Sequence, residues 1–183
     1  MKNLTELFLE ELADVYSAEQ QLIKALPKMA EAANSPELKE AIESHLEETE
    51  EHARRIEQVF EVFEEKPYAK KCKAMAGLIA EGEDILDEDG DPNLKDAGII
   101  AAAQKVEHYE IATYGTLRTW ASLLEKEEAE NLLEETLEEE RSADEKLTGI
   151  AEAINMEAEA EGEGEEGEGE EEESSSSRGK AKR

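Results

Sequence analysis

The chain has 183 residues, of which fifty are acidic and twenty are basic, so its formal net charge is −30. This charge repels phosphate backbones and anionic lipids, only 4% of the residues are aromatic, and no apolar stretch could cross a bilayer, so we expect neither a nucleic-acid partner nor a membrane. The single cysteine, Cys72, excludes an intramolecular disulfide, and acidic residues stand where a signal peptide has an apolar core, so we expect a cytoplasmic protein.

Residues that favour helices dominate the chain up to residue 156, and helix-breaking residues are few and clustered. Asn34 and Ser35 end one helix, and Ser35 followed by Pro36 is typical of an N-cap with proline at the first helical position. Further breaks lie near Pro67 and Pro92, and a weaker one without glycine or proline lies near residue 126. The sequence therefore predicts five helices, at residues 3–33, 36–64, 70–88, 94–124 and 127–155.

Residues 157–183 differ in composition from the rest. Glutamate and glycine alternate there, four serines follow, and four basic residues lie among the last six. Because this segment has many like charges and no apolar periodicity, we expect a disordered acidic tail with a basic C-terminus after a helical domain of residues 1–156.

Most of the negative charge belongs to the helical domain, because residues 157–183 carry only eleven of the fifty acidic residues. Such a surface repels itself unless salt screens it, and the screening length falls to about 3 Å at 1 M salt. We therefore expect a halophilic protein, adapted to a salt-rich cytoplasm.

Two predicted helices carry a carboxylate in the middle of an otherwise apolar stripe. Glu19 interrupts the stripe of the first helix and Glu110 that of the fourth, at the spacing that faces the core of a helix bundle. Burying an unpaired carboxylate is costly, so each should be protonated, ion-paired or bound to a metal ion. The other two long helices also have polar centres, formed by His45, Thr49 and His52 and by Thr136 and Glu140, with Glu48 and Glu139 one position off the stripe.

The two halves of the domain share an internal register. An offset of 91 residues carries Glu19 onto Glu110 and Glu48 onto Glu139 without a gap over some forty residues. The sequence therefore predicts an all-α, up-down four-helix bundle in which a short crossover helix joins two duplicated helical hairpins.

Folding the hairpins about a pseudo-twofold axis would bring these carboxylates and an imidazole together, which is the ligand set of a bundle that binds two iron or manganese ions. The candidate metal ligands are Glu19, His45, Glu48, His52, Glu107, Glu110, Glu139 and Glu140. The pattern departs from the usual Glu-x-x-His motif, because Thr49 precedes His52 and Ala143 follows Glu140 at that spacing. A second metal would then be bound by carboxylates alone, more weakly, or not at all.

Each candidate also has a simpler interpretation. Glu19 and Glu110 could be buried carboxyl groups that are hydrogen-bonded to a tyrosine or a histidine, and His45 and His52 could be core or interface histidines. Glu107, Glu139 and Glu140 stand in glutamate-rich helices, where a solvated face would explain any one of them.

Five segments resemble the YciE/YciF-type stress proteins: DVYSAEQQLIKALPKMA, HLEETEEHARRIEQVF, KKCKAMAGLI, AAAQKVEHYEIATYGTL and LLEETLEEERSADEKL. The resemblance covers residues 4–155. It implies a ferritin-like four-helix bundle, a dinuclear metal site, a stress-associated role and a homodimer, in a family whose members are labelled as proposed ferroxidases.

Two classes of function follow. In the first, a ferritin-like stress-response protein oxidises Fe(II) or consumes O₂ or peroxide at a dinuclear site, as a ferroxidase or peroxide-consuming oxidase. In the alternative, the chain forms a non-catalytic dimeric scaffold whose core carboxylates are structural. A cage-forming storage ferritin is a third possibility.

Overall fold

The computed structural model describes the backbone of residues 2–177 and the side chains of residues 2–160. This part of the chain contains no strand, and its five helices are, in order, α1 (Leu4–Ala32), α2 (Pro36–Val62), α3 (Lys73–Asp87), α4 (Pro92–Leu123) and α5 (Glu127–Ser177). The predicted all-α class is confirmed, and every helix end but the last lies within three residues of its predicted position. No described helix is both long enough and apolar enough to cross a membrane.

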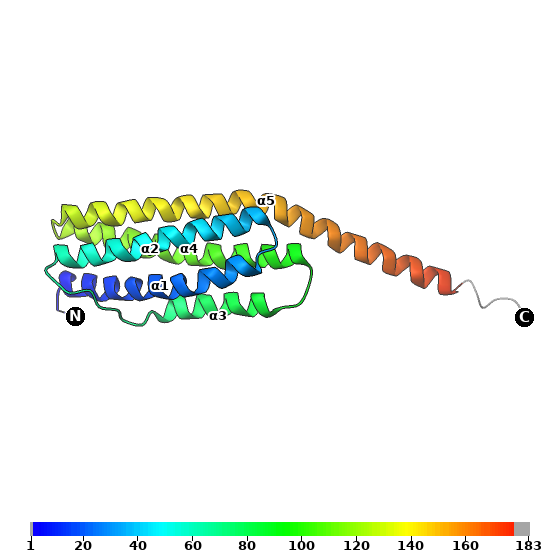
Figure 1. Ribbon diagram of the computed structural model, residues 1–183, viewed down its shortest axis with the longest axis horizontal. Coiled ribbons are helices and arrows are strands. Elements are labelled where there is room, and N and C mark those ends of the chain that lie inside the picture. The colour runs from blue at the N-terminus through cyan, green and yellow to red at the C-terminus, as the bar shows by residue number, and fades with distance from the viewer. Residues whose placement is uncertain (1, 178–183) are drawn as a thin grey trace, which may run out of the picture.

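Four long helices form the bundle, and α3 lies along its side (Figure 1). Helix α1 packs against α2 and α4, and α5 packs against the same two helices, so the order around the bundle is α1, α2, α5, α4. Helix α3 packs against α1 and α4 and carries the chain from the end of α2 to the start of α4. This is the predicted pair of helical hairpins joined by a crossover helix.

Capping side chains fix the starts of α2 and α4. The Ser35 side chain accepts a hydrogen bond from the backbone N–H of Leu38, with Pro36 at the first position of α2, as predicted. Asp91 does the same for α4, because its carboxylate accepts from two backbone N–H groups at 2.8 and 2.9 Å. Helices α2 and α4 are followed by Glu64 and Glu125 at φ of 58° and 57°, in the left-handed region that favours glycine. The absence of glycine there explains why the sequence signal near residue 126 is weak.

Asp96 ties the two hairpins together at one end of the bundle. It belongs to α4, is fully buried, and its two carboxylate oxygens accept the backbone N–H groups of Asn34 and Ser35 at 2.8 and 2.7 Å. A carboxylate that accepts two backbone donors makes two charge-assisted hydrogen bonds. The turn between α1 and α2 is therefore fixed against α4.

Helix α5 extends beyond the other four helices (Figure 1) and is helical to Ser177, through residues in which we expected disorder. Ala158, at 7% exposed, is the last buried residue among the described side chains, so the packed core ends close to residue 156. The division into a domain and a tail stays a prediction, and residues 178–183 lie outside the described part.

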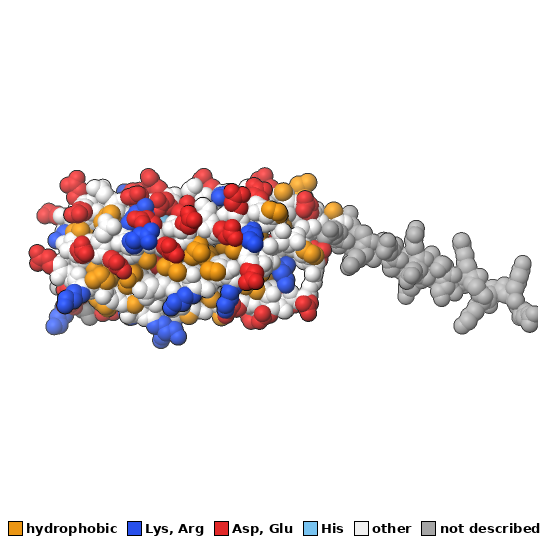
Figure 2. Space-filling model, viewed as in Figure 1, with side chains coloured by type: hydrophobic (Ala, Val, Ile, Leu, Met, Phe, Trp, Pro, Cys, Tyr) orange, Lys and Arg blue, Asp and Glu red, His pale blue; other side chains and the backbone are white. Residues whose placement is uncertain are grey.

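Acidic side chains cover much of the bundle face in Figure 2, and basic side chains are fewer. Some of the surface charge is paired. Lys28 lies 3.0 Å from Glu83, and Lys70 lies 2.8 Å from Glu10. Exposed pairs of this kind contribute little to stability, so most of the acidic surface repels itself in dilute salt.

Candidate metal centre

The bundle core contains a cluster of buried carboxylates and imidazoles at its centre. All four long helices contribute, and every member is at most 8% exposed. Six of the eight predicted ligands belong to it: Glu19 from α1, His45 and His52 from α2, Glu107 and Glu110 from α4, and Glu140 from α5.

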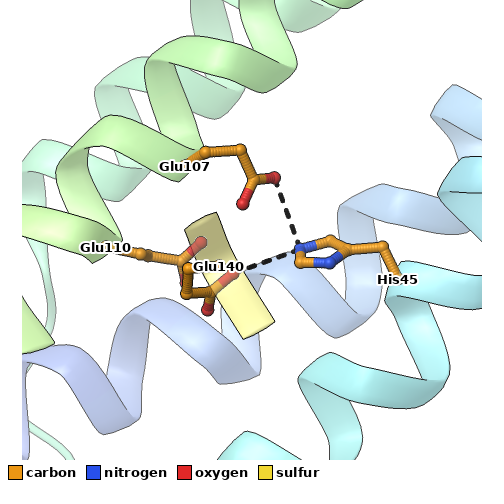
Figure 3. A group of neighbouring side chains, drawn as sticks. All are labelled: His45, Glu107, Glu110 and Glu140. Carbon is orange, nitrogen blue, oxygen red and sulfur yellow. Dashed lines mark ion pairs between the residues drawn. The ribbon is translucent and has the colours of Figure 1, made fainter. Parts of the chain in front are cut away.

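One half of the cluster surrounds His45 (Figure 3). Its Nε2 lies 3.4 Å from a carboxylate oxygen of Glu107 and 3.8 Å from one of Glu140. Together with Glu110, these residues offer four ligand atoms that all lie within 4.8 Å of one another. One nitrogen and three oxygens at such spacing suit a borderline divalent cation such as Fe²⁺ or Mn²⁺.

The other half surrounds His52. Its Nδ1 lies 3.0 Å from Glu140 and 3.9 Å from Glu19, and the three residues again offer ligand atoms within 4.8 Å of one another. Glu140 therefore belongs to both halves, through different oxygens. A carboxylate in that position could bridge two cations.

The hydrogen bonds of this cluster are incomplete. Tyr114 donates its hydroxyl hydrogen to Glu19, so one oxygen of Glu19 is satisfied in the way that the simpler interpretation required. Eight other buried ligand atoms make no regular hydrogen bond within the described part of the chain, and two of them, Nδ1 of His52 and Oε1 of Glu140, meet instead as an ion pair at 3.0 Å. The eight atoms are Oε2 of Glu19, Nε2 of His45, Nδ1 of His52, Oε2 of Glu107, and both oxygens of Glu110 and Glu140. Each buried polar atom left without a partner costs about 1–3 kcal/mol, and bound cations would satisfy these atoms together. The donor set therefore fits two metal ions.

The proton affinities in the cluster are strongly perturbed. Burial raises the pKa of Glu19 to about 7, and burial together with the neighbouring carboxylates raises the pKa of Glu107 and of Glu110 well above the usual range. Burial lowers the pKa of His45, but Glu107, Glu48 and Glu140 outweigh it, so that this pKa rises to about 10. The pKa of Glu140 is lowered, because the two imidazoles outweigh the effect of its burial. Without metal the cluster thus holds protons, which binding of cations would release.

The two remaining predicted ligands, Glu48 and Glu139, lie outside both groups. Glu48 contacts Nδ1 of His45 at 3.4 Å, and Glu139 contacts Nε2 of His52 at 3.0 Å, so each carboxylate faces the imidazole nitrogen that points away from the cluster. Their positions one residue off the apolar stripes explain this placement. Such carboxylates orient a metal-binding imidazole and raise its basicity.

Arg55 is a functional candidate that the sequence analysis missed. It is 7% exposed and binds both oxygens of Glu139, one of them at 2.9 Å, and its guanidinium also lies 3.0 Å from Glu135. Burial raises the pKa of Glu139, but Arg55 and His52 outweigh it and lower that pKa. An arginine beside an otherwise apolar stripe, three residues after His52, was the available signal.

Other residues occupy the two positions at which this chain departs from the Glu-x-x-His motif. Thr49 occupies the place of a glutamate on α2, and its hydroxyl donates to the carbonyl oxygen of His45 at 2.7 Å instead. Ala143 occupies the place of a histidine on α5. The second imidazole of the cluster comes from His45, two helical turns before His52 on the same face of α2.

Cys72 lies apart from the cluster and is fully buried. Its sulfur caps the start of α3 and lies 3.1 Å from the hydroxyl of Tyr109. Burial raises the pKa of the Cys72 thiol, which fits an unreactive structural residue rather than an activated nucleophile.

Comparisons with known proteins agree with this architecture. A family described as a domain of unknown function (DUF892) matches residues 3–160. Protein YciF of Escherichia coli (strain K12) is 48% identical over 152 residues, which cover 82% of this chain and 92% of that protein. The crystal structure of the E. coli stress protein YciF matches with a TM-score of 0.82 and 47% identity, covering 84% of this chain and 98% of that one. YcfI from Rhodopseudomonas palustris, provisionally described as a structural protein, matches with a TM-score of 0.79 and 44% identity, covering 80% and 94%.

Proposed function

The chain belongs to the YciF-type (DUF892) family, and we propose that its buried histidine–carboxylate cluster binds two iron or manganese ions. The observation that carries this proposal is Glu140, whose two oxygens face different halves of the cluster, at 3.8 Å from Nε2 of His45 and 3.0 Å from Nδ1 of His52, and make no regular hydrogen bond within the described part of the chain. Charge balance supports it as well. Four buried carboxylates carry four negative charges when ionised, which two divalent cations neutralise, and unpaired buried charges are costly.

The activity we propose is the oxidation of Fe(II) or the consumption of O₂ or peroxide, in a stress-associated role like that of the E. coli stress protein YciF. Two bound divalent ions would supply one electron each, so that one oxidant molecule accepts two electrons. The chain's own residues prepare the site. Tyr114 holds one oxygen of Glu19, and Glu48 and Glu139 hold the outward nitrogens of the two imidazoles. The full burial of Glu19, His52 and Glu140 limits the access of water to that half of the cluster.

The decisive experiment compares metal binding by wild type, Glu140→Gln and Glu138→Gln. Glu138 is exposed and lies two residues away on the same helix, so its variant is a matched control. We expect about two Fe(II) ions per chain in wild type and the control, measured by anaerobic titration and elemental analysis. We expect Glu140→Gln to lose binding at both positions, because its shared carboxylate is gone. Equal binding by Glu140→Gln and Glu138→Gln would exclude Glu140 as the bridging ligand.

A second candidate function is favoured by the hydrogen bond from Tyr114 to Glu19 and by the raised pKa values of Glu107 and Glu110. Carboxyl groups that keep their protons could form a metal-free polar core, in a non-catalytic bundle that acts as a homodimeric scaffold. In that case wild type would bind neither Fe(II) nor Mn(II), and Glu110→Gln would leave stability unchanged. Sedimentation analysis would test the dimer, which both candidate functions allow.

A further inference from the structure

A pocket leads from the surface to one half of the cluster. Its volume is about 60 Å³, and it lies between α2 and α5 with Leu26 of α1 and Ala103 of α4 in its wall. The exposed side chain of Ser44 lines it, and so do the buried His45 and Glu107. The pocket therefore connects solvent with the group around His45.

The other half of the cluster has no part in this pocket. Neither Glu19 nor His52 lines it, and both are fully buried. Tyr114 covers Glu19, and Glu139 covers the outward nitrogen of His52. A molecule in the pocket would thus meet the His45 half first.

Ala143 accounts for the space. It lines the pocket from α5, at the position that corresponds to His52 in the other hairpin. A histidine or any other large side chain at this position would project into the pocket. The departure from the Glu-x-x-His motif therefore has a structural consequence, because a small residue on α5 opens a path to an imidazole supplied by α2.

The size and lining of the pocket restrict what it can take. One water needs about 10–15 Å³, so about 60 Å³ holds a few waters or one small molecule. The wall is mostly aliphatic, from residues such as Leu26, Met29 and Leu147, which disfavours a hydrated cation. The polar lining carries both signs of charge, from Glu48 and Glu107 and from Lys146 and the imidazole of His45, so it favours neither an anion nor a cation.

We propose that this pocket binds a small neutral molecule of the size of dioxygen or hydrogen peroxide and delivers it to the His45 half of the cluster, and that Ala143 sets the size limit. Delivery of an oxidant rests on the proposed function, whereas binding in the pocket does not. The asymmetry of access gives the two halves different tasks. The His45 half meets the incoming molecule, and the His52 half stays enclosed.

The first test uses xenon as a neutral probe and the full-length, metal-free chain. We expect dissolved xenon to shift the imidazole NMR signals of His45 and to leave those of His52 in place. Ala143→Leu should weaken xenon binding at least about tenfold, because leucine fills the space. Ala153→Leu, an exposed site on the same helix, should bind like wild type. Equal shifts at both histidines, or unchanged binding by Ala143→Leu, would overturn the proposal.

The second test uses Fe(II)-loaded protein mixed with O₂. Ala143→Leu should slow Fe(II) oxidation at least about tenfold while binding as much Fe(II) as wild type, and Ala153→Leu should react normally. Ser44→Phe narrows the mouth from the exposed surface of α2 and should act in the same direction, which guards against a folding defect in Ala143→Leu. Wild-type rates of Fe(II) oxidation in both Ala143→Leu and Ser44→Phe would rule out this route. A wild-type chain that binds no Fe(II) would instead refute the proposed metal centre, and the xenon result would still decide the pocket.

Discussion

The two hairpins of the bundle share a sequence register but divide the donor atoms unequally. The α1–α2 hairpin supplies both imidazoles and one carboxylate to the cluster, and the α4–α5 hairpin supplies three carboxylates and no imidazole. The difference arises at four register positions. His45 and His52 correspond to Thr136 and Ala143, and Glu107 and Glu140 correspond to Tyr16 and Thr49.

Neither hairpin therefore holds a complete site. Each group of ligand atoms contains a nitrogen from α2. The oxygens come from α4 and α5 in the His45 half and from α1 and α5 in the His52 half, so Glu140 of α5 belongs to both. A metal ion that binds here connects the two hairpins, so its binding free energy also stabilises their docking. We therefore expect the loss of cluster ligands from either hairpin to empty both metal positions.

The largest expected effect comes from removing the nitrogen donors of the α1–α2 hairpin. His45→Ala combined with His52→Ala should reduce Fe(II) affinity by more than about 100-fold, because the carboxylates left behind repel one another and favour protonation. Isothermal titration and elemental analysis measure this loss. His108→Ala is the control, since His108 lies exposed on α4 away from the cluster. A double variant that still binds two ions per chain would show that the imidazoles are not ligands.

The second-largest expected effect is the pH dependence of the stability of the metal-free protein. The folded-state pKa of Glu19, about 7, lies above its unfolded value of about 4.5, so its proton stabilises the fold below pH 4.5 and this stability is lost as the pH rises through 7. Glu107 and His45, whose pKa values are also raised, act in the same direction. From pH 5 to pH 8 we expect a loss on the order of 2 kcal/mol from Glu19 alone.

Urea unfolding with a chelator at constant ionic strength measures this dependence of the free energy of unfolding on pH. Glu19→Gln should flatten it, and added Fe(II) or Mn(II) should stabilise the protein more at pH 8 than at pH 5, because cations replace the protons. A metal-free protein whose stability rises between these pH values would contradict the assignment of protons to the cluster.

The sequence predicted the fold and the burial of Glu19 and Glu110, because both depend on periodicity. Glu19 and Glu110 interrupt apolar stripes, and a buried stripe faces the core of a bundle whatever the details of packing. The placement of Glu48 and Glu139 could not be predicted, since one position off a stripe can face either the core or the outer side of a neighbouring imidazole. Long-range contacts such as those of Arg55 and Asp96 leave no periodic signal, because they depend on how helices dock.

Substitution of Asp96 tests the docking of the two hairpins independently of metal binding. Asp96→Ala should lower the free energy of unfolding by about 2 kcal/mol, because two charge-assisted hydrogen bonds to the turn between α1 and α2 disappear. The exposed Asp89 is the control, and Asp89→Ala should change stability by less than about 0.5 kcal/mol. Urea unfolding of the metal-free chains measures both values, and equal stabilities would remove Asp96 as the connection between hairpins.

The smallest expected effects come from substituting Glu139 and Glu48, the carboxylates that contact the outward nitrogens of His52 and His45. Glu139 contacts His52 at 3.0 Å and is itself held by Arg55, whereas Glu48 contacts His45 at 3.4 Å and its side chain is 44% exposed. Loss of such an orienting carboxylate lowers metal affinity by about 10–100-fold in well-ordered sites. We therefore expect Glu139→Gln to weaken Fe(II) binding by about tenfold and Glu48→Gln by less, with two ions still bound at saturation in both variants. Titration curves that reverse this order would mean that the more exposed His45 half, not the enclosed His52 half, depends more on its outer carboxylate.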